Sequence, residues 1–283
     1  MLRVVTVIGH GLELLPHFLN HYKFADEINI VVYESHMAPN LANQIKHQIQ
    51  FHKNAKIVEI LHGSVFDWNK VTQLYNAIKT QHPDDWWIVA DIDELQIYPH
   101  GDPNIKINEC DRNGWEMVRG GFIDRVGING KFPMITPNKS LFAQFPMMGF
   151  FRYPLSKACP NKVSMMKGYI EITSGQHYAK IDGHTTWKWQ GWDHPLIAPY
   201  HEWSVQVHHF KWDSTCLDRI RAVADMKSVE SFSDEYERMY HAIKDNKIDV
   251  RNKEYMFEMS EVTDCTFETY SQWNKLMKKI VSI

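Results

Sequence analysis

The chain has 283 residues, of which 44% are hydrophobic and 23% are charged, and this composition argues against an extensively disordered protein. The net charge of −3 and the lack of a basic face in the sequence give no reason to expect a nucleic-acid partner. The four cysteines contain no CxxC pair, which argues against structural zinc and favours reduced thiols, with two disulfides as the alternative.

The first hundred residues alternate between apolar strands and amphipathic helices. We predict strands at Val4–Ile8, at Ile28–Tyr33, at Ile57–Ile60 and over a run that ends at Asp91. The helical spacing of apolar residues covers the stretches 14–22, 41–49 and 71–78. Asp67 is the expected N-cap of the last of these helices. This order predicts an α/β fold with a mostly parallel sheet flanked by helices.

After Pro99 the pattern changes. Residues 101–212 are rich in Gly, Pro and aromatic residues and show little helical periodicity, so we expect strands joined by long loops. Helical spacing returns from Ser214 onward and ends in a basic amphipathic stretch, Trp273–Ile280, which packs on its own domain or docks on a membrane surface. Val4–Ile8 is too short for a signal sequence or a membrane span, and no other apolar run is long enough, so we expect a cytoplasmic protein.

The most informative segment is the apolar run Trp86–Ala90, which is followed by Asp91, Asp93 and Glu94. Side chains alternate along a strand, so Asp91 and Asp93 are expected to point to the same side. Two like charges at the end of a buried strand call for a cation, and Mn²⁺ or Mg²⁺ is suited to carboxylate ligands. The alternatives are a phosphoryl nucleophile at Asp91, as in aspartate-dependent phosphatases, and a solvated loop in which an Asp caps a helix.

A second polar cluster occurs in the predicted strand Val205–Trp212. Alternation places His208 on one face and His209 with Lys211 on the other. Imidazole suits Mn²⁺ and the Lys211 ammonium suits a phosphate, whereas the structural alternative is a histidine that is satisfied in the core. Asp124-Arg125 is either a structural ion pair or a contact with an acceptor.

Other polar segments are compatible with binding or with structure. Gly9-His10-Gly11 follows the first strand and predicts a tight turn with room for a base or ribose. Ser174–His177 predicts a turn that exposes its last two residues. Lys157 and Lys162 are either diphosphate contacts or surface lysines. The sequence contains no GxSxG elbow, Walker loop, HExxH or GxGxxG motif.

Several of these segments resemble a known family when they are taken in order. They are Trp86–Glu94, GGFIDR at 120–125, QFP at 144–146, GQH at 175–177 and HHFKW at 208–212, with LELLPHFLNHY at 12–22. Together they resemble the family-2-like glycosyltransferases of the GT-A fold and their family-92-like relatives, over roughly residues 1–225. The resemblance implies a Rossmann-like GT-A catalytic domain at 1–212, with a nucleotide-sugar half at 1–115 and an acceptor half at 116–212, followed by a C-terminal helical extension at 213–283.

The resemblance also implies that the chain transfers a sugar from a UDP-linked donor to a hydroxyl of a carbohydrate-type acceptor. Asp91 and Asp93 would bind the metal together with His208 or His209. The residues expected to contact the nucleotide sugar are Gly9, His10, Glu34, Asp91, Lys157, Lys162, His177 and Lys211.

Two features depart from the family pattern. The second strand ends in Tyr-Glu-Ser rather than in an Asp-rich sequence, and the Glu-Asp pair that supplies the base of inverting members is missing. The base is therefore left open among Glu94, Asp182, Asp193 and Glu202.

Two other functions are also left open. The same carboxylates would serve a metal-dependent phosphatase or nucleotide-sugar hydrolase. A non-catalytic carbohydrate-binding module would instead rely on aromatic side chains, and these are the same tryptophans that we expect to form the acceptor platform, namely Trp187, Trp189, Trp192 and Trp203.

Overall fold

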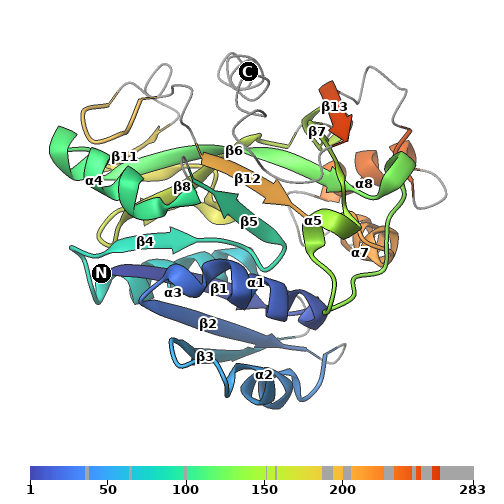
Figure 1. The fold of residues 1–283 in the computed structure, drawn as a ribbon, viewed down its shortest axis with the longest axis horizontal. Helices are drawn as coiled ribbons and strands as arrows, with labels where there is room; N and C mark the ends of the chain where they lie inside the picture. Colours follow the sequence, from blue (N-terminus) through green and yellow to red (C-terminus); the bar gives the residue numbers. More distant parts are fainter. Residues whose placement is uncertain are drawn as a thin grey trace. The chain divides into compact units, whose positions relative to one another are not determined.

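The computed structural model describes residues 1–35, 38–63, 66–98, 101–150, 152–156, 158–186, 194–199, 205–225, 233–243, 247–249 and 257–261. They form two compact units, and each takes two separate stretches of the chain (Figure 1). The first unit comprises the described residues of Met1–Gly121 and Asn161–Val207, and the second those of Phe122–Pro160 and from His208 onward. The boundaries expected from the sequence, after residues 115 and 212, differ from this division and stay a prediction.

The first unit is built on a parallel sheet. Its four strands are β1 (Leu2–Ile8), β2 (Glu27–Glu34), β3 (Ala55–His62) and β4 (Trp86–Val89). β1 pairs with β2 on one side and with β4 on the other, β2 pairs with β3, and all three pairs are parallel. Every residue of β1 and β4 is buried, as expected for parallel strands covered on both faces. The predicted α/β fold is confirmed.

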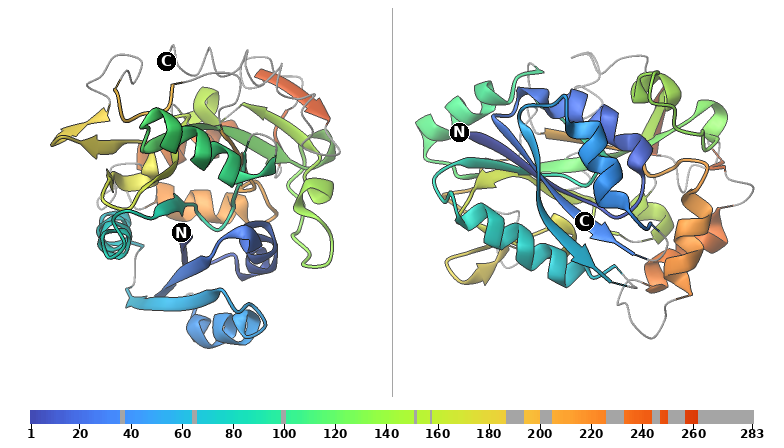
Figure 2. Two further views of the ribbon diagram at one scale, coloured as in Figure 1. Left: turned by 60° about the vertical axis from the view of Figure 1, so that its left-hand side comes forward. Right: turned by 90° about the horizontal axis from the view of Figure 1, so that it is seen from below.

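Helices cover both faces of this sheet. They are α1 (Leu15–His21), α2 (Leu41–Ile49) and α3 (Trp68–Thr80), and the 3₁₀ turns η1 (Leu12–Leu14) and η2 (Tyr22–Phe24) flank α1. Figure 2 shows α1 and α2 on one side of the strands and α3 on the other. Right-handed crossovers require this arrangement, because the chain moves outward from β1 to β3 and then returns past β1 to β4. The Asp67 carboxylate accepts the Lys70 N–H at 3.0 Å, which confirms the predicted N-cap of α3.

Further strands extend the first unit in the antiparallel direction. β8 (Asn161–Lys167) pairs with β4, and the first half of β6 (Met117–Val126) pairs with β8. β5 (Glu94–Ile97) pairs with β12 (Val205–His209), and β12 also pairs with β6. β9 (Glu171–Ile172), β10 (Ala179–Ile181) and β11 (His184–Thr185) form a small separate sheet, and the 3₁₀ turn η5 (Ser174–Gln176) lies between β9 and β10.

The longest of the described helices within residues 101–212 was not predicted. α4 spans Pro103–Asn113, with Asp102 as its N-cap and Pro103 in its first turn. Its buried positions are Pro103, Lys106 and Cys110. Of these three only Cys110 counts as hydrophobic, so the buried positions show no apolar residues at helical spacing here. The expectation of strands and loops throughout residues 101–212 was therefore wrong at this helix.

The second unit combines a short sheet with helices. The second half of β6 pairs with β7 (Met147–Phe150), and β7 pairs with β13 (Phe257–Glu261). The helices are α5 (Leu141–Gln144), α6 (Arg152–Ser156), α7 (Cys216–Ala224) and α8 (Ser233–Ala242), and η4 (Ile128–Gly130) is a 3₁₀ turn. α7 and α8 confirm the helical periodicity after Ser214. β13 corrects the purely helical expectation for this region, because the backbone of β7 offers it a strand partner. The Trp273–Ile280 stretch lies outside the described residues.

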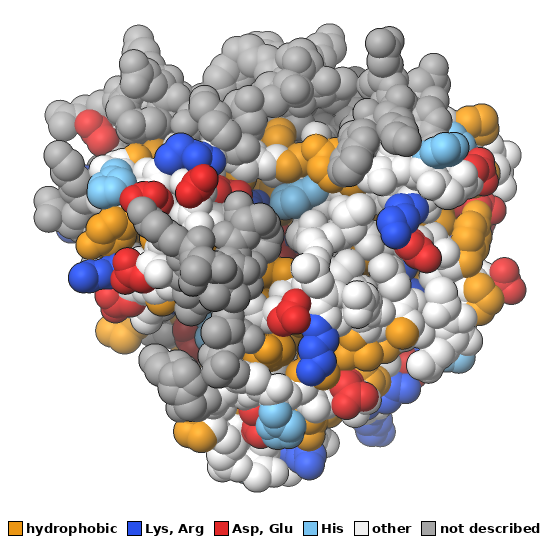
Figure 3. All heavy atoms as spheres, turned by 180° about the vertical axis from the view of Figure 1, so that it is seen from behind, with side chains coloured by type: hydrophobic (Ala, Val, Ile, Leu, Met, Phe, Trp, Pro, Cys, Tyr) orange, Lys and Arg blue, Asp and Glu red, His pale blue; other side chains and the backbone are white. Residues whose placement is uncertain are grey.

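Three observations bear on the environment of the protein. In the part of the chain that the structure describes, no helix is both long enough and apolar enough to cross a membrane. Cys110, Cys159 and Cys216 are free thiols, and Cys265 lies outside the described residues. On the face shown in Figure 3, Lys and Arg side chains are interspersed with Asp and Glu, and no basic patch gathers among the described residues.

Candidate functional site

The candidate site lies where the strand order of the parallel sheet reverses. β1 stands between β2 and β4, so the loop after β1 and the loop after β4 leave the sheet next to each other. In open α/β sheets this point, outside the carboxyl ends of the strands, is where ligands bind. Gly9-His10-Gly11 forms the first loop, and a Cβ atom built on Gly11 would lie 3.9 Å from Ile92 Cγ2 in the second. Gly11 has φ = 70°, a conformation that favours glycine.

The loop after β4 is a tight turn rather than a continuation of the strand. β4 ends at Val89, and the Glu94 N–H donates to the Asp91 carbonyl at 2.9 Å. The backbone is not extended at this point, so strand alternation does not apply there, and the common orientation of Asp91 and Asp93 stays a prediction. A turn still holds both carboxylates at the carboxyl edge of the sheet. Glu94 adds a second link, since its Oε2 accepts the Asp91 N–H at 3.1 Å.

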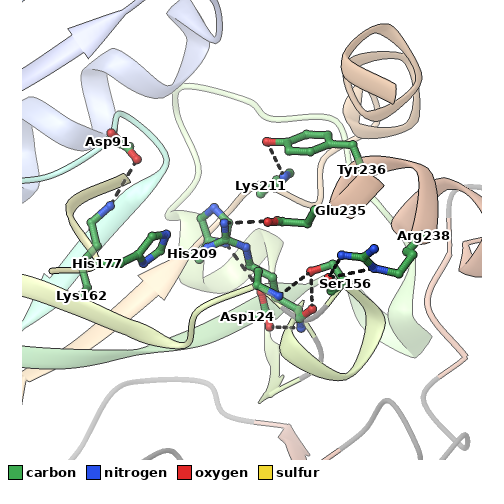
Figure 4. Close-up of polar contacts among 12 residues, drawn as sticks. Asp91, Asp124, Ser156, Lys162, His177, His209, Lys211, Glu235, Tyr236 and Arg238 are labelled. Carbon is green, nitrogen blue, oxygen red and sulfur yellow. Dashed lines mark hydrogen bonds and ion pairs between the residues drawn. The ribbon is translucent and has the colours of Figure 1, made fainter. Parts of the chain in front are cut away.

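Lys162 provides the counter-charge for this turn. Its Nζ lies 2.7 Å from Glu94 Oε1 and 3.3 Å from Asp91 Oδ2 (Figure 4), and its side chain is 1% exposed. The antiparallel pairing of β8 with β4, in which Met165 pairs with Ile88, brings the start of β8 to the end of β4, where the turn follows. Lys162 was predicted as a diphosphate contact or a surface lysine. The structure buries it against the carboxylates.

One carboxylate oxygen of the turn has no partner in the structure. Asp91 Oδ1 is buried and makes no hydrogen bond, whereas Asp91 Oδ2 faces Lys162. A buried acceptor without a donor is costly unless a ligand satisfies it. Anionic oxygen is also the donor type that Mg²⁺ and Mn²⁺ prefer. The turn could therefore hold a hard divalent cation through Asp91 and through Asp93, which is half-buried two residues later. No group of three or more His, Cys, Asp or Glu side chains forms a complete metal cage among the described residues.

Buried tyrosines fix the position of the turn. The Tyr22 hydroxyl donates to the Glu94 carbonyl at 3.1 Å and accepts the Gln96 N–H at 3.0 Å. The Gln96 side chain donates to the Val89 carbonyl at 3.1 Å, which links the end of β4 to β5. Burial raises the pKa of Tyr22 well above its usual value, the nearby Tyr98 and Glu94 raise it further, and the hydrogen bond from the Gln96 N–H offsets part of this rise. Tyr22 therefore keeps its proton and remains a hydrogen-bond donor to the Glu94 carbonyl.

A second polar cluster lies in the second unit and is described by itself. Asp124 accepts hydrogen bonds from Trp212 Nε1 at 3.0 Å and from the Arg152 N–H at 2.8 Å, and His209 Nδ1 lies 3.6 Å from its Oδ1 (Figure 4). Burial by itself would raise the pKa of Asp124, but His209 and these two donors hold it below its usual value. The sequence left Asp124 open between an ion pair and an acceptor contact, and the structure shows a fully enclosed hydrogen-bonded carboxylate.

The other polar residues of the HHFKW segment have close neighbours in the same unit. The His208 ring packs edge-on against Phe142, with 5.5 Å between ring centroids. Lys211 Nζ lies 3.2 Å from the Tyr236 hydroxyl and 4.2 Å from the centre of the Tyr236 ring. The assignment of His208, His209 and Lys211 to the metal and the diphosphate stays a prediction.

Glu34 caps a helix. Its Oε1 accepts the Ala42 N–H at 2.8 Å in the first turn of α2, where the N-cap Asn40 makes no side-chain cap hydrogen bond. His62 Nδ1 lies 3.6 Å from the other oxygen of Glu34. The predicted nucleoside contact at Glu34 would therefore have to share this carboxylate with the helix.

The remaining candidates lie in other loops of the first unit or outside the described residues. Asp182 has φ = 51° and precedes Gly183 in the tight turn between β10 and β11, where its carboxylate is 77% exposed and 3.4 Å from His194 Nε2. His10 is exposed in the loop after β1. His177 is half-buried, and its Nδ1 lies 2.7 Å from the Asn161 carbonyl. Outside the described residues lie Lys157, Asp193, Glu202, Trp187, Trp189, Trp192 and Trp203.

Comparisons with known proteins give only distant likenesses. No protein-family model and no curated protein matches the chain. Among solved structures, the chain is similar to "Crystal structure of mannose-6-phosphate isomerase from Helicobacter pylori", with a TM-score of 0.34 and 14% identity over 59% of this chain and 71% of that one. It is also similar to a UTP-bound UGPase from Acinetobacter baumannii, with a TM-score of 0.27 and 8% identity over 47% of this chain and 61% of that one. At these TM-scores, the residues of those proteins are not transferred to this chain.

Proposed function

We propose that the chain is a metal-dependent glycosyltransferase that moves a sugar from a UDP-linked donor to a hydroxyl of a carbohydrate-type acceptor. The observation that carries this proposal is the Asp91–Glu94 turn at the reversal point of the parallel sheet, where one buried carboxylate oxygen is left without a partner. A nucleoside diphosphate needs both a cation for its phosphates and an edge of the sheet for its base, and this point offers the two together. The resemblance of the DxDE and HHFKW segments to GT-A glycosyltransferases supports the same function.

The residues of the turn have distinct parts in this proposal. Asp91 and Asp93 are the protein ligands of Mn²⁺ or Mg²⁺, which stabilises the negative charge that grows on the departing nucleoside diphosphate. Lys162 offsets part of the carboxylate charge and fixes the orientation of Asp91. The turn around Gly9 and His10 would lie beside the nucleoside, and Gly9 itself packs closely, because a Cβ atom built on it would lie 3.4 Å from the Phe66 ring.

Glu94 is better suited to positioning than to proton transfer. A base must reach the acceptor hydroxyl with a free oxygen. The two oxygens of Glu94 face Lys162 and the Asp91 N–H, and the residue is buried. We therefore assign Glu94 to holding the turn and leave the base among Asp182, Asp193 and Glu202.

The test is a thermal-shift and titration screen of UDP and UDP-sugars with and without Mn²⁺. We expect stabilisation that requires both nucleotide and metal, of about 2.7 kcal/mol at a hundredfold excess over Kd. Asp91→Asn and Asp93→Asn should abolish it, whereas Asp84→Asn, on an exposed loop of the same unit, should not. The absence of any metal-dependent nucleotide binding would overturn the proposal. Release of phosphate from a simple phosphoester, lost in Asp91→Asn, would favour the phosphatase instead.

A further inference from the structure

The loop between β9 and β10 has a conformation that the chain does not adopt without cost. It is closed by the Thr173 N–H, which donates to the Tyr178 carbonyl at 2.9 Å, and by the Gln176 N–H, which donates to the Thr173 carbonyl at 2.9 Å. Gly175 has φ = 74°, and a Cβ atom there would lie 2.8 Å from the His177 ring, so the position requires glycine. Gln176 follows with φ = 53°.

Gln176 is unusual in both its backbone and its side chain. The other described non-glycine residues with positive φ are Asn or Asp, which tolerate this conformation, whereas Gln lacks their short polar side chain. Gln176 is fully buried, yet neither the oxygen nor the nitrogen of its carboxamide has a hydrogen-bond partner in the structure. Strained backbone and unsatisfied buried amides both reduce stability, and the two together mark a site where a ligand supplies what is missing.

The loop lies at the same edge of the sheet as the Asp91 turn. His177 Nδ1 lies 2.7 Å from the carbonyl of Asn161, and Asn161 precedes Lys162, whose ammonium contacts Asp91 (Figure 4). On its other side the loop reaches the first turn of α3, where the Ser174 hydroxyl lies 2.8 Å from Asn69 Oδ1. The N-terminus of α3 follows the carboxyl end of β3 in the chain. All of these contacts are within the first unit.

We propose that Gln176 determines which donor sugar is accepted, by binding hydroxyl groups of the sugar through its carboxamide. This inference rests on the proposed function. A carboxamide offers two N–H donors and one accepting oxygen, which matches the alternating donor and acceptor capacity of neighbouring sugar hydroxyls. It carries no charge, so it suits the neutral sugar, whereas the diphosphate belongs with the metal and Lys162. Unmet amide groups also give strong discrimination, because a sugar that lacks the matching hydroxyl leaves them buried and unpaired.

The test compares Gln176→Met with Gln144→Met. Methionine keeps the volume and removes the amide in both. Gln144 is the matched control because it is also buried, but its amide is fully used by Thr136 and Lys139. The binding of UDP and of a panel of UDP-sugars that differ in single hydroxyls is measured by titration calorimetry with Mn²⁺, on the full chain.

We expect Gln176→Met to bind UDP as the wild type does and to lose at least tenfold in the ratio of affinities between the preferred UDP-sugar and its epimers. Gln144→Met should lower the unfolding temperature but keep that ratio. If Gln176→Met does not fold, Gln176→Asn tests the same point, because Asn tolerates the positive φ and withdraws the amide by one methylene group.

Three results would overturn the inference, and they are distinguishable. An unchanged affinity ratio in both Gln176 variants, with metal-dependent UDP binding intact, would reject the role of Gln176 and leave the proposed function standing. No metal-dependent binding of UDP or any UDP-sugar by the wild type would reject both. A selective loss of acceptor use with donor ratios unchanged would move the residue to the acceptor side and also reject the inference as stated.

Discussion

Two aspartates, Asp91 in the first unit and Asp124 in the second, handle a poorly solvated charge in opposite ways. Asp124 is fully buried, and both of its oxygens accept hydrogen bonds from neighbouring groups. Asp91 is 20% exposed, and Lys162 contacts one of its oxygens while the other has no partner in the structure. The comparison teaches that burial alone does not mark a ligand site. A buried acceptor atom that receives no hydrogen bond from the protein is a more informative sign of a ligand site.

The comparison also separates two ways in which the fold compensates the charge of a carboxylate. At Asp124 the neighbouring groups complete a closed network, whose expected effect is on stability. At the Asp91 turn the Lys162 ammonium contacts two carboxylates, those of Asp91 and Glu94. Neither of these two contacts involves Asp93. The four predictions that follow test this contrast, from the largest expected effect to the smallest.

The largest effect is expected from removing the shared cation. Lys162→Met leaves Glu94 buried without its partner, and we expect a loss of about 3–5 kcal/mol in the free energy of unfolding, measured by urea denaturation. Lys180→Met is the matched control, because Lys180 pairs with Glu171 at 3.1 Å while both side chains are 53% exposed. The control should lose less than about 1 kcal/mol. Similar losses in the two variants would mean that the turn does not depend on Lys162.

The second prediction concerns the closed network. Asp124→Asn replaces an accepting oxygen by an N–H₂ group that faces donors, and we expect a loss of about 2–3 kcal/mol in the free energy of unfolding. Asp91→Asn should lose less free energy of unfolding, because one of the Asp91 oxygens accepts no hydrogen bond that the substitution would remove. Asp225→Asn, 75% exposed in the second unit, should change stability by less than about 0.5 kcal/mol. A greater loss at Asp91 than at Asp124 would reverse the contrast.

The third prediction concerns pH and the support of the Asp91 turn. Burial lowers the pKa of His21 to about 4, although the Gln96 carbonyl, 2.9 Å from its Nε2, favours the charged form. In the unfolded chain the His21 imidazole binds a proton near pH 6.5, whereas in the folded chain it binds one only near pH 4. The contribution of neutral His21 to the free energy of unfolding is therefore fully present above pH 6.5 and is lost as the pH falls toward 4. The partial exposure of His21 reduces the effect, and we expect a loss of about 1–2 kcal/mol between pH 6.5 and pH 5.

Urea denaturation at pH 7, 6 and 5 measures this loss. His21→Gln should remove the pH-dependent part, and His47→Gln, at an exposed position of α2, should retain it. Parallel curves for wild type and His21→Gln would show that His21 does not titrate differently in the folded chain.

The smallest effect is expected at Glu34. Glu34→Gln weakens the acceptor at the start of α2 and should reduce the free energy of unfolding by about 0.5–1 kcal/mol. Glu59→Gln, exposed on β3, is the control. The variant also sharpens the contrast between structural and ligand carboxylates. A loss of UDP affinity of tenfold or more, with little change in stability, would show that Glu34 contacts the nucleoside rather than serving mainly as a cap.

Local patterns in the sequence were enough for the parallel half of the fold. The strands β1 to β4 and the N-cap Asp67 follow from hydrophobic periodicity and from capping chemistry, which act over a few residues. The placement of carboxylates at the edge of the sheet follows from the same pattern. The end of β4 was misjudged by two residues, because the apolar run continues through Ala90, past the last residue of the strand, and does not show where the strand ends.

Contacts between distant segments could not be predicted. Lys162 reaches Glu94 because β8 pairs with β4 in one particular register, and nothing in the local sequence specifies that pairing. Glu34 caps α2 because Asn40, with φ = 63°, makes no side-chain cap hydrogen bond. Gln176 was seen only as part of an exposed turn, whereas the structure buries it. In each case tertiary packing decides the role.

The register of β8 against β4 has a consequence for modularity. Lys162 lies 68 residues after Glu94 along the chain, so a carboxylate cluster in the N-terminal part of the first unit receives its counter-ion from a later strand. A slip of one residue in this register would turn the Lys162 side chain away from Asp91 and Glu94 and leave the cluster uncompensated. A fragment that stops before β8 would therefore contain every predicted metal ligand of the turn and still lack the electrostatic balance that holds it in shape. The carboxylate cluster obtains its counter-charge only when β8 pairs with β4 and brings Lys162 to it.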